Sequence, residues 1–279
     1  MTLGKRRGKN KKKRKEKCSL VLIYFVRYDK FMHLHEMEIF QLGLEDLVAH
    51  LSFIIVIIAG IAVTALSIIS LFWKHPKEKV KKSLFFSIAG VTLFATIFLA
   101  VSTIYLNNVS SSGGPVHWHA DFEIWNCGQE VDLLDPEGWS NKIGTPTLHE
   151  HNDKRIHLEG VVVKPTDASL GKFFHVIGGA ISPTSITFPT NFGLVTKQTG
   201  DVCPNGITGE MQVFAYRTVH GIYSQQKITD PANFIISPSG AVPPGDCIII
   251  EFDQTKDKTD KLCRSYKVAE QLGKIRSKM

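Results

Sequence analysis

Cysteine is scarce in this chain, and its spacing excludes two common kinds of site. Only 5 of the 279 residues are cysteine, and no two of them form a C-x-x-C pair. A zinc ribbon and a thioredoxin-like redox motif both need such pairs, so the sequence excludes both. Outside the N-terminal block there are four cysteines: Cys127, Cys203, Cys247 and Cys263. An even number permits two disulfides in an oxidising compartment, with three alternative connectivities.

Charged residues are absent from two long stretches. Residues 48–73 contain no Asp, Glu, Lys or Arg, and residues 84–107 form a second stretch of the same kind. A helix of about 20 apolar residues is long enough to cross the hydrocarbon core of a membrane. Both stretches are apolar on all sides, whereas a helix of a soluble core has an apolar stripe. The sequence therefore predicts a transmembrane hairpin of two helices over residues 48–107.

Basic residues are missing from both outer flanks of this hairpin. The connecting loop, residues 74–82, carries five lysines, whereas residues 31–47 and 107–126 contain no Lys or Arg. Cytoplasmic loops close to membrane spans carry an excess of positive charge, so the loop is expected inside and both flanks outside. We therefore expect a multi-pass protein of the cell membrane, with two spans and an extracytoplasmic C-terminal domain.

The first 47 residues form a basic and polar segment that conflicts with this orientation. Residues 5–17 contain ten Lys and Arg, which are costly to carry across a membrane. The interpretation that we favour is that translation begins at Met32 or Met37. The alternative is that the basic block stays inside and inverts the whole chain. The formal net charge of +7 comes from such local clusters. Clusters of this kind are typical of solvated or membrane-surface segments, so no nucleic-acid binding is expected.

The rest of the chain reads as a linker (108–115), a histidine-rich β domain (116–253) and a basic tail (254–279). Alternating or continuous apolar patterns predict strands in the following stretches: 116–125, 130–134, 148–151, 155–163, 185–188, 211–217, 233–237 and 247–252. One short helix is expected over 166–179, and the tail from Asp257 is expected to be a polar helix. The fold class is therefore α+β, two transmembrane helices followed by a β-rich domain. A β-grasp-like arrangement is favoured, and a β-sandwich is the alternative.

Histidine is concentrated in this domain. Five of the 11 histidines lie between residues 117 and 157. On a strand, residues i and i+2 project from the same face, roughly 6.5–7 Å apart. Two such pairs and one His-x-Glu are in phase with the predicted strands, and they make up the candidate metal ligands: His117, His119, His149, His151, His157 and Glu159. Zinc sites of the carbonic-anhydrase kind are built in this way, from histidines on neighbouring strands.

The ligand types restrict the metal. Met211 is the only methionine between the linker and the chain end, and no Cys-His-Met loop typical of blue copper is present. Imidazole with carboxylate suits a divalent metal, and zinc and copper are both retained as candidates. His175 is expected to pack against the core, and His220 is left without a role.

Three families share parts of these motifs. HWHADF resembles the metallo-β-lactamase pattern H-x-H-x-D-H, but Phe122 replaces its last histidine. HWHADFEIWNCG is similar to the first cupin motif, which implies His117, His119 and Glu123 as ligands, but the PPGD stretch lacks the second motif's histidine. A closer resemblance covers residues 115–252. The H-x-H, L-H-x-H, I-H-x-E and L-G-x-F-F motifs look like those of an uncharacterised group of archaeal and bacterial membrane-anchored proteins. That resemblance implies a shared histidine site and names no reaction.

These patterns leave three functions open, and they do not identify a protein partner. The favoured hypothesis is a membrane-anchored extracytoplasmic metal-binding domain, active in metal handling or as a metal-dependent partner module. The second is a metal-dependent hydrolase or hydratase in which Glu123, Glu150 or Glu159 acts as general base. The third is a recognition or structural domain whose histidines only form hydrogen bonds with one another and with Asp121, Glu150 and Asp153.

Overall fold

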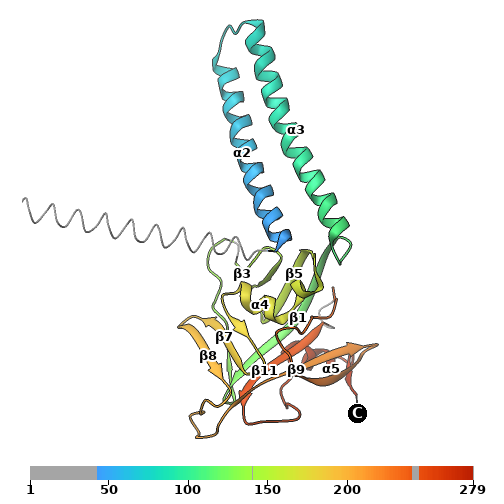
Figure 1. The fold of residues 1–279 in the computed structure, drawn as a ribbon. Helices are drawn as coiled ribbons and strands as arrows, with labels where there is room; N and C mark the ends of the chain where they lie inside the picture. Colours follow the sequence, from blue (N-terminus) through green and yellow to red (C-terminus); the bar gives the residue numbers. More distant parts are fainter. Residues whose placement is uncertain (1–42, 140, 241–244, 279) are drawn as a thin grey trace, which may run out of the picture. The chain divides into compact units, whose positions relative to one another are not determined.

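Two long helices begin the described part of the chain, α2 (Leu44–Phe72) and α3 (Glu78–Val109). The computed structural model describes residues 43–139, 141–240 and 245–278, so the basic block and the candidate start sites lie outside the described residues. The two helices lie side by side (Figure 1). Helix α3 begins at Glu78, so part of the expected lysine-rich loop is the first turn of this helix.

Both helices are long and apolar enough to cross a membrane, by length and composition. Their large apolar side chains face outward, and Phe53, Ile61, Phe86 and Phe94 are each about two-thirds exposed. A contiguous apolar surface of this size is unfavourable in water and marks a surface for lipid or protein. The predicted pair of apolar N-terminal helices is therefore confirmed.

The β domain is built on one large mixed sheet (Figure 1). Its strand order is β12-β10-β9-β11-β1-β5-β4-β3, and the short strand β2 also pairs with β1. Strand β1 pairs in parallel with β11 and antiparallel with β5. The strands of this sheet are β1 (Pro115–Asn126), β2 (Gln129–Val131), β3 (Ile143–Gly144), β4 (Leu148–Glu150), β5 (Arg155–Val161), β9 (Glu210–Val219), β10 (Ile222–Ile228), β11 (Asp246–Asp253) and β12 (Arg276–Ser277).

Alternation along the strands separates the two faces of this sheet. The domain has two hydrophobic cores, one on each face of this sheet. On β1, Ala120, Phe122 and Ile124 are buried in the larger core, and the residues between them point to the other face. Helix α4 (Leu170–Val176) packs into the same larger core through Leu170, Phe173 and Phe174. Strand β11 contributes apolar side chains to both cores, as expected for a strand covered on both faces. The α+β class predicted from the sequence is confirmed.

The expected helix over 166–179 is shorter than predicted. A 3-10 turn, η1 (Pro165–Ala168), comes first, and α4 begins only after Ser169. Ser169 accepts a hydrogen bond from the backbone N–H of Lys172 at 3.1 Å, so it is the N-cap in place of Thr166 or Asp167. A second, three-stranded sheet follows, made of β6 (Ala180–Ile181), β7 (Ser185–Thr190) and β8 (Gly193–Gln198).

The C-terminal residues are attached to the sheet on the face opposite α4. Helix α5 (Arg264–Gln271) places Tyr266 and Ala269 in the second core, next to Phe214 and Ile249. The Tyr266 hydroxyl donates a hydrogen bond to the Tyr216 carbonyl at 3.2 Å. A disulfide between Cys247 and Cys263 joins β11 to the start of α5.

The second disulfide joins Cys127, in the turn after β1, to Cys203. The four cysteines of the domain are therefore all paired, in one of the three connectivities that the sequence left open.

Most of the expected strands are present, but the prediction of a strand over residues 233–237 is wrong. Residues 233–237 contain only an isolated bridge between Ser169 and Ile235. Two longer strands that the sequence did not suggest are present, β8 and β10, together with the two-residue strands β3, β6 and β12. Both longer strands are rich in polar residues, so neither has the apolar pattern that marks the buried strands.

Candidate metal centre

The predicted histidines lie on one face of three adjacent strands. In the hydrogen-bonded register, His119 on β1 is opposite His157 on β5, and His157 is opposite His149 on β4. These three side chains therefore form a row across the sheet. In the neighbouring row His117 is opposite Glu159, and His151 follows the end of β4. This is the face on which α5 packs, and α4 lies behind it.

Three of the histidines come close enough to share one ion. Among the described residues, His117, His119 and His157 form the group whose ligand atoms all lie within 4.8 Å of one another. Nitrogen atoms bound to one tetrahedral ion are separated by about 3.3 Å, since each metal–nitrogen distance is about 2.0–2.1 Å. The His117 side chain is 60% exposed and that of His157 is 12% exposed, and the ligand atoms would have to approach by side-chain rotation to bind one ion. The three rings, which we call the histidine triad, can therefore hold a metal ion.

Two carboxylates orient the rings of the triad. His157 Nε2 lies 3.1 Å from Asp153 Oδ2, and His117 Nε2 lies 3.0 Å from Glu159 Oε1. An ionised carboxylate only accepts hydrogen bonds, so each Nε2 carries the proton and each Nδ1 keeps its lone pair. His157 Nδ1 is buried and makes no hydrogen bond, and the same is true of His119 Nδ1. A metal centre requires imidazole nitrogen atoms with free lone pairs, on rings that a carboxylate orients through the other ring nitrogen.

The electrostatics favour neutral rings. Burial, together with the positive charge that His117 and His157 carry when protonated, lowers the pKa of His119. Burial and then the nearby Lys142 ammonium lower the pKa of His149 to about 4. A ring that is neutral at pH 7 binds a metal without first losing a proton.

The turn between β4 and β5 positions Asp153. Asn152 and Lys154 both adopt left-handed backbone conformations, with φ of 64° and 59°. Glu150 Oε1 accepts hydrogen bonds from the backbone N–H groups of Asp153 at 2.7 Å and Lys154 at 3.1 Å. Burial raises the pKa of Asp153, but the hydrogen bond from His157 and the charges of His157 and Arg155 outweigh it, so the net pKa is lowered. Asp153 is therefore an anion facing His157.

The three glutamates proposed as general bases make different contacts in the structure. Glu150 closes the turn described above, and Glu123 lies under α5. There Glu123 accepts hydrogen bonds from Trp125 Nε1 at 3.0 Å and from the backbone N–H of Arg264 at 3.1 Å. Burial raises the pKa of Glu123, and Trp125 and Arg264 act in the opposite direction. Among the described residues, Glu159 is the one of these three glutamates that contacts histidines of the candidate ligand set, which we call the histidine cluster.

The ligand set that the cupin resemblance implies is not brought together, because Glu123 is engaged under α5. Of the acids that the third hypothesis joined to the histidines, Asp153 contacts His157, whereas Asp121 pairs with Arg155.

His175 is exposed, so the expectation that it packs against the core is wrong. It lies in the last turn of α4, whose other large side chains fill the core.

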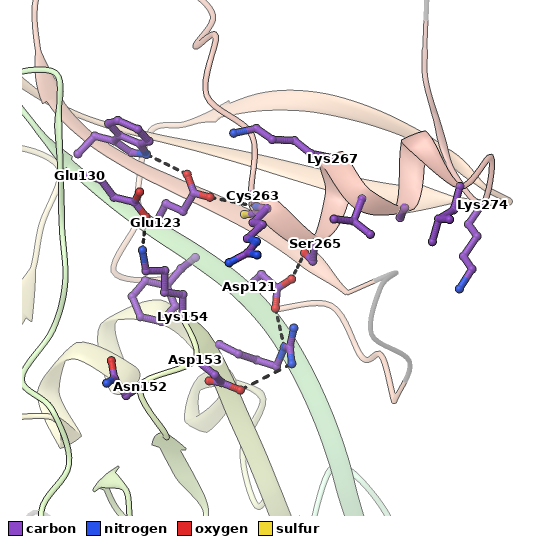
Figure 2. Close-up of a pocket in the computed structure, with 17 residues that line it drawn as sticks. Asp121, Glu123, Glu130, Asn152, Asp153, Lys154, Cys263, Ser265, Lys267 and Lys274 are labelled. Carbon is purple, nitrogen blue, oxygen red and sulfur yellow. Dashed lines mark hydrogen bonds and ion pairs between the residues drawn. The ribbon is translucent and has the colours of Figure 1, made fainter.

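A pocket of about 820 Å³ lies beside the cluster, between β1, the 152–155 turn and α5 (Figure 2). Figure 2 shows Asp121 at its centre, between Ser265 on α5 and the arginine that links it to Asp153. Arg155 Nε donates to Asp121 Oδ1 at 2.6 Å, and Arg155 Nη1 lies 3.6 Å from Asp153 Oδ2. A continuous polar chain therefore leads from His157 through Asp153 and Arg155 to the pocket.

The sequence did not suggest Arg155 or Ser265 as residues of this region. The R-I-H spacing places Arg155 on the same face of the strand as His157, which is a signal that alternation provides. No pattern in the sequence indicates Ser265, because its contact depends on the packing of α5 against a strand more than 100 residues earlier in the chain.

Replacing Asp153 with alanine is expected to lower the affinity for a metal ion by about 10- to 100-fold, because an outer partner fixes the tautomer and direction of its ligand. Isothermal titration of the full chain in detergent micelles with Zn²⁺ measures this effect. Asp132→Ala is the matched control, since Asp132 contacts Lys154 in the same region and no histidine. Equal affinities for the Asp153→Ala and Asp132→Ala variants would contradict the assignment of Asp153.

Comparison of the chain with protein-family models, curated proteins and solved structures finds no match. The resemblance of its motifs to the membrane-anchored group therefore stays a prediction.

Proposed function

We propose that this chain is a membrane-anchored protein whose β domain binds zinc or copper on the extracytoplasmic side of the cell membrane and takes part in metal handling. The observation that carries the proposal is the histidine triad, His117, His119 and His157, on adjacent strands. His119 and His157 each have a ring nitrogen without a hydrogen bond, and carboxylates orient the rings of His117 and His157. Three imidazoles leave at least one position of a tetrahedral ion open, which suits transfer of the ion or binding of a small ligand.

Two further features support the anchoring of the chain in a membrane and the extracytoplasmic location of the β domain. The apolar side chains of α2 and α3 face outward, as they do on helices in contact with lipid. The disulfides Cys127–Cys203 and Cys247–Cys263 form and persist in oxidising compartments outside the cytoplasm. The lysine-rich connection at 74–82 then lies on the cytoplasmic side, in agreement with the charge rule.

We also infer a β-grasp-like arrangement for the domain. The strand order supports it, because the first long strand, β1, is central and parallel to the last long strand, β11. Strand β5 flanks β1, strand β9 flanks β11 with β10 beyond it, and α4 lies between β5 and β9 in the chain.

Metal binding is expected to raise the thermal stability of the full chain in detergent micelles. At a free Zn²⁺ or Cu²⁺ concentration about 100 times the Kd, the gain is about 2.7 kcal/mol, and excess chelator removes it. The gain should be lost in acid, since histidine must be neutral to bind. Burial lowers the pKa of His119, so this ring stays neutral to a lower pH than an ordinary histidine. Differential scanning fluorimetry at pH 7.5 and pH 5 measures both effects. A melting temperature that responds to neither ion nor chelator would favour the third hypothesis, a domain without metal.

A metal-dependent hydrolase or hydratase is the second candidate function. The observation that favours it is the pocket, which the Asp153–Arg155–Asp121 chain joins to His157. In this case Glu159, which faces His117 and His149, is the general base for a metal-bound water. A panel of ester, phosphoester and hydration substrates, with and without chelator, tests it. Turnover that the chelator abolishes and Glu159→Gln reduces would support the enzyme.

A further inference from the structure

Two histidines of the cluster lie outside the triad, His149 and His151. Their ring centroids are 4.7 Å apart and their planes are inclined by 80°. The His117–His119 pair has a similar separation, 4.5 Å. The cluster therefore consists of two such pairs, on either side of His157, whose centroid lies 5.0 Å from those of both His119 and His151.

An ion held by the triad is not placed to take His149 as well. The lone pairs of an imidazole lie in the plane of its ring, so a ligand ring points its edge at the metal. The rings of His149 and His157 are stacked, nearly parallel at 6°, with centroids 5.6 Å apart. Their lone pairs thus lie in two separate, nearly parallel planes and do not converge on one atom. The strands that carry His119 and His149 are also separated by the whole of β5.

Both outer rings nevertheless have nitrogen atoms that need a partner. His151 Nδ1 lies 2.5 Å from the Asn141 carbonyl, so Nδ1 carries the proton and Nε2 keeps a lone pair. The His149 side chain is 1% exposed, and its Nδ1 makes no hydrogen bond. Its Nε2 lies 3.9 Å from Glu159 Oε2. A polar nitrogen that is buried without a partner is rare, and a bound water or ion is one explanation for it.

Glu159 faces both halves of the cluster. Its Oε1 lies 3.0 Å from His117 Nε2, and its Oε2 faces His149. The first oxygen orients a ligand of the triad, and the second is available to a cation beside His149. We infer that His149, His151 and Glu159 Oε2 bind a second divalent cation, so that the domain holds two ions with Glu159 between them. The inference rests on the proposed function, because the first of the two ions is the one held by the triad.

The stoichiometry of metal binding tests this inference. The full chain in detergent micelles is titrated with Zn²⁺ alone, and bound zinc is counted by elemental analysis after desalting. His33 and His35 form another H-x-H pair in the N-terminal segment, so both are replaced by alanine in every sample. In this background we expect two ions per chain, and one ion per chain after His149→Ala with His151→Ala. The control is His175→Ala with His220→Ala, which should keep both ions.

Each outcome distinguishes the second ion from the first. One ion per chain in the background protein, or two ions retained without His149 and His151, would overturn the inference and leave the triad intact. No ion in any sample would overturn the proposed function and the inference together. Because the loss of buried His149 also affects packing, His151→Ala is measured alone, and it should weaken the second ion by at least tenfold and leave the first ion unchanged. Circular dichroism checks that every variant is folded.

Discussion

The His157→Ala variant is expected to bind zinc or copper more than about 100-fold more weakly than the unchanged chain. Loss of a partner that merely orients a ligand costs about 10- to 100-fold, and loss of the ligand itself costs more. His157 has the largest effect because it stands between the two pairs of rings and belongs to the triad. Competition with a chromophoric chelator of known affinity measures the change in the full chain.

The matched control for this variant is His175→Ala. His175 is an exposed histidine of the same domain, and it lies on a helix that packs on the opposite face of the sheet. It should leave the affinity unchanged. If His157→Ala and His175→Ala lower the affinity equally, the ion is bound by dispersed surface histidines and the triad is not a site.

Removing the Cys127–Cys203 disulfide is expected to lower the stability of the domain by about 4.5 kcal/mol. This disulfide joins residues 76 apart, and the entropy of the unfolded chain rises with the length of the loop that is released. The Cys247–Cys263 disulfide closes only 16 residues, and its removal should cost about 3 kcal/mol by the same relation. Paired alanine substitutions, Cys127→Ala with Cys203→Ala, isolate the first effect. The melting temperature should fall by roughly 9–18 °C.

The same cysteines test the side of the membrane. In the unreduced full chain these four thiols should not react with maleimide, whether or not the protein is unfolded first. Reaction of all four in the unfolded chain would show that the disulfides do not form in the cell. It would remove the main support for an extracytoplasmic domain and leave the geometry of the histidine triad unaffected.

Alternation in the sequence predicted the site face well. His117, His119 and Asp121 repeat at every second position, with Trp118 and Ala120 between them, so the strand and its polar face follow from period two. The apolar run at 247–252 likewise became β11, which is covered on both faces. Such signals are local, and each was present within a few residues of sequence.

Contacts between distant segments could not be read in this way. The pairing of β4 with β5 and of β5 with β1 decides that His149 and His119 lie on either side of His157, and spacing along the chain does not encode it. The sequence predicted six ligands for a metal site, whereas the register divides them into a triad and an outer pair with Glu159. The position of α5 over Asp121 likewise depends on a disulfide and a buried tyrosine whose partners are remote in the sequence.

Polar strands at or near the edges were missed for a related reason. Strand β10 pairs with β9 on one side and only with the two residues of β12 on the other, so most of its length needs few apolar side chains. Strand β8 is the outer strand of the small sheet. A pattern of buried apolar residues detects strands through their burial, and it therefore fails where burial is small.

If the proposed function is right, the histidines of this domain hold a metal ion in the native protein. The most direct measurement is elemental analysis of the full chain, extracted from membranes in detergent and purified without chelator. Its comparison is the same chain with His119→Ala and His157→Ala. We expect at least one zinc or copper ion per unchanged chain and a loss of at least one ion in the variant. Equal metal content in the two proteins, or none in either, would contradict it.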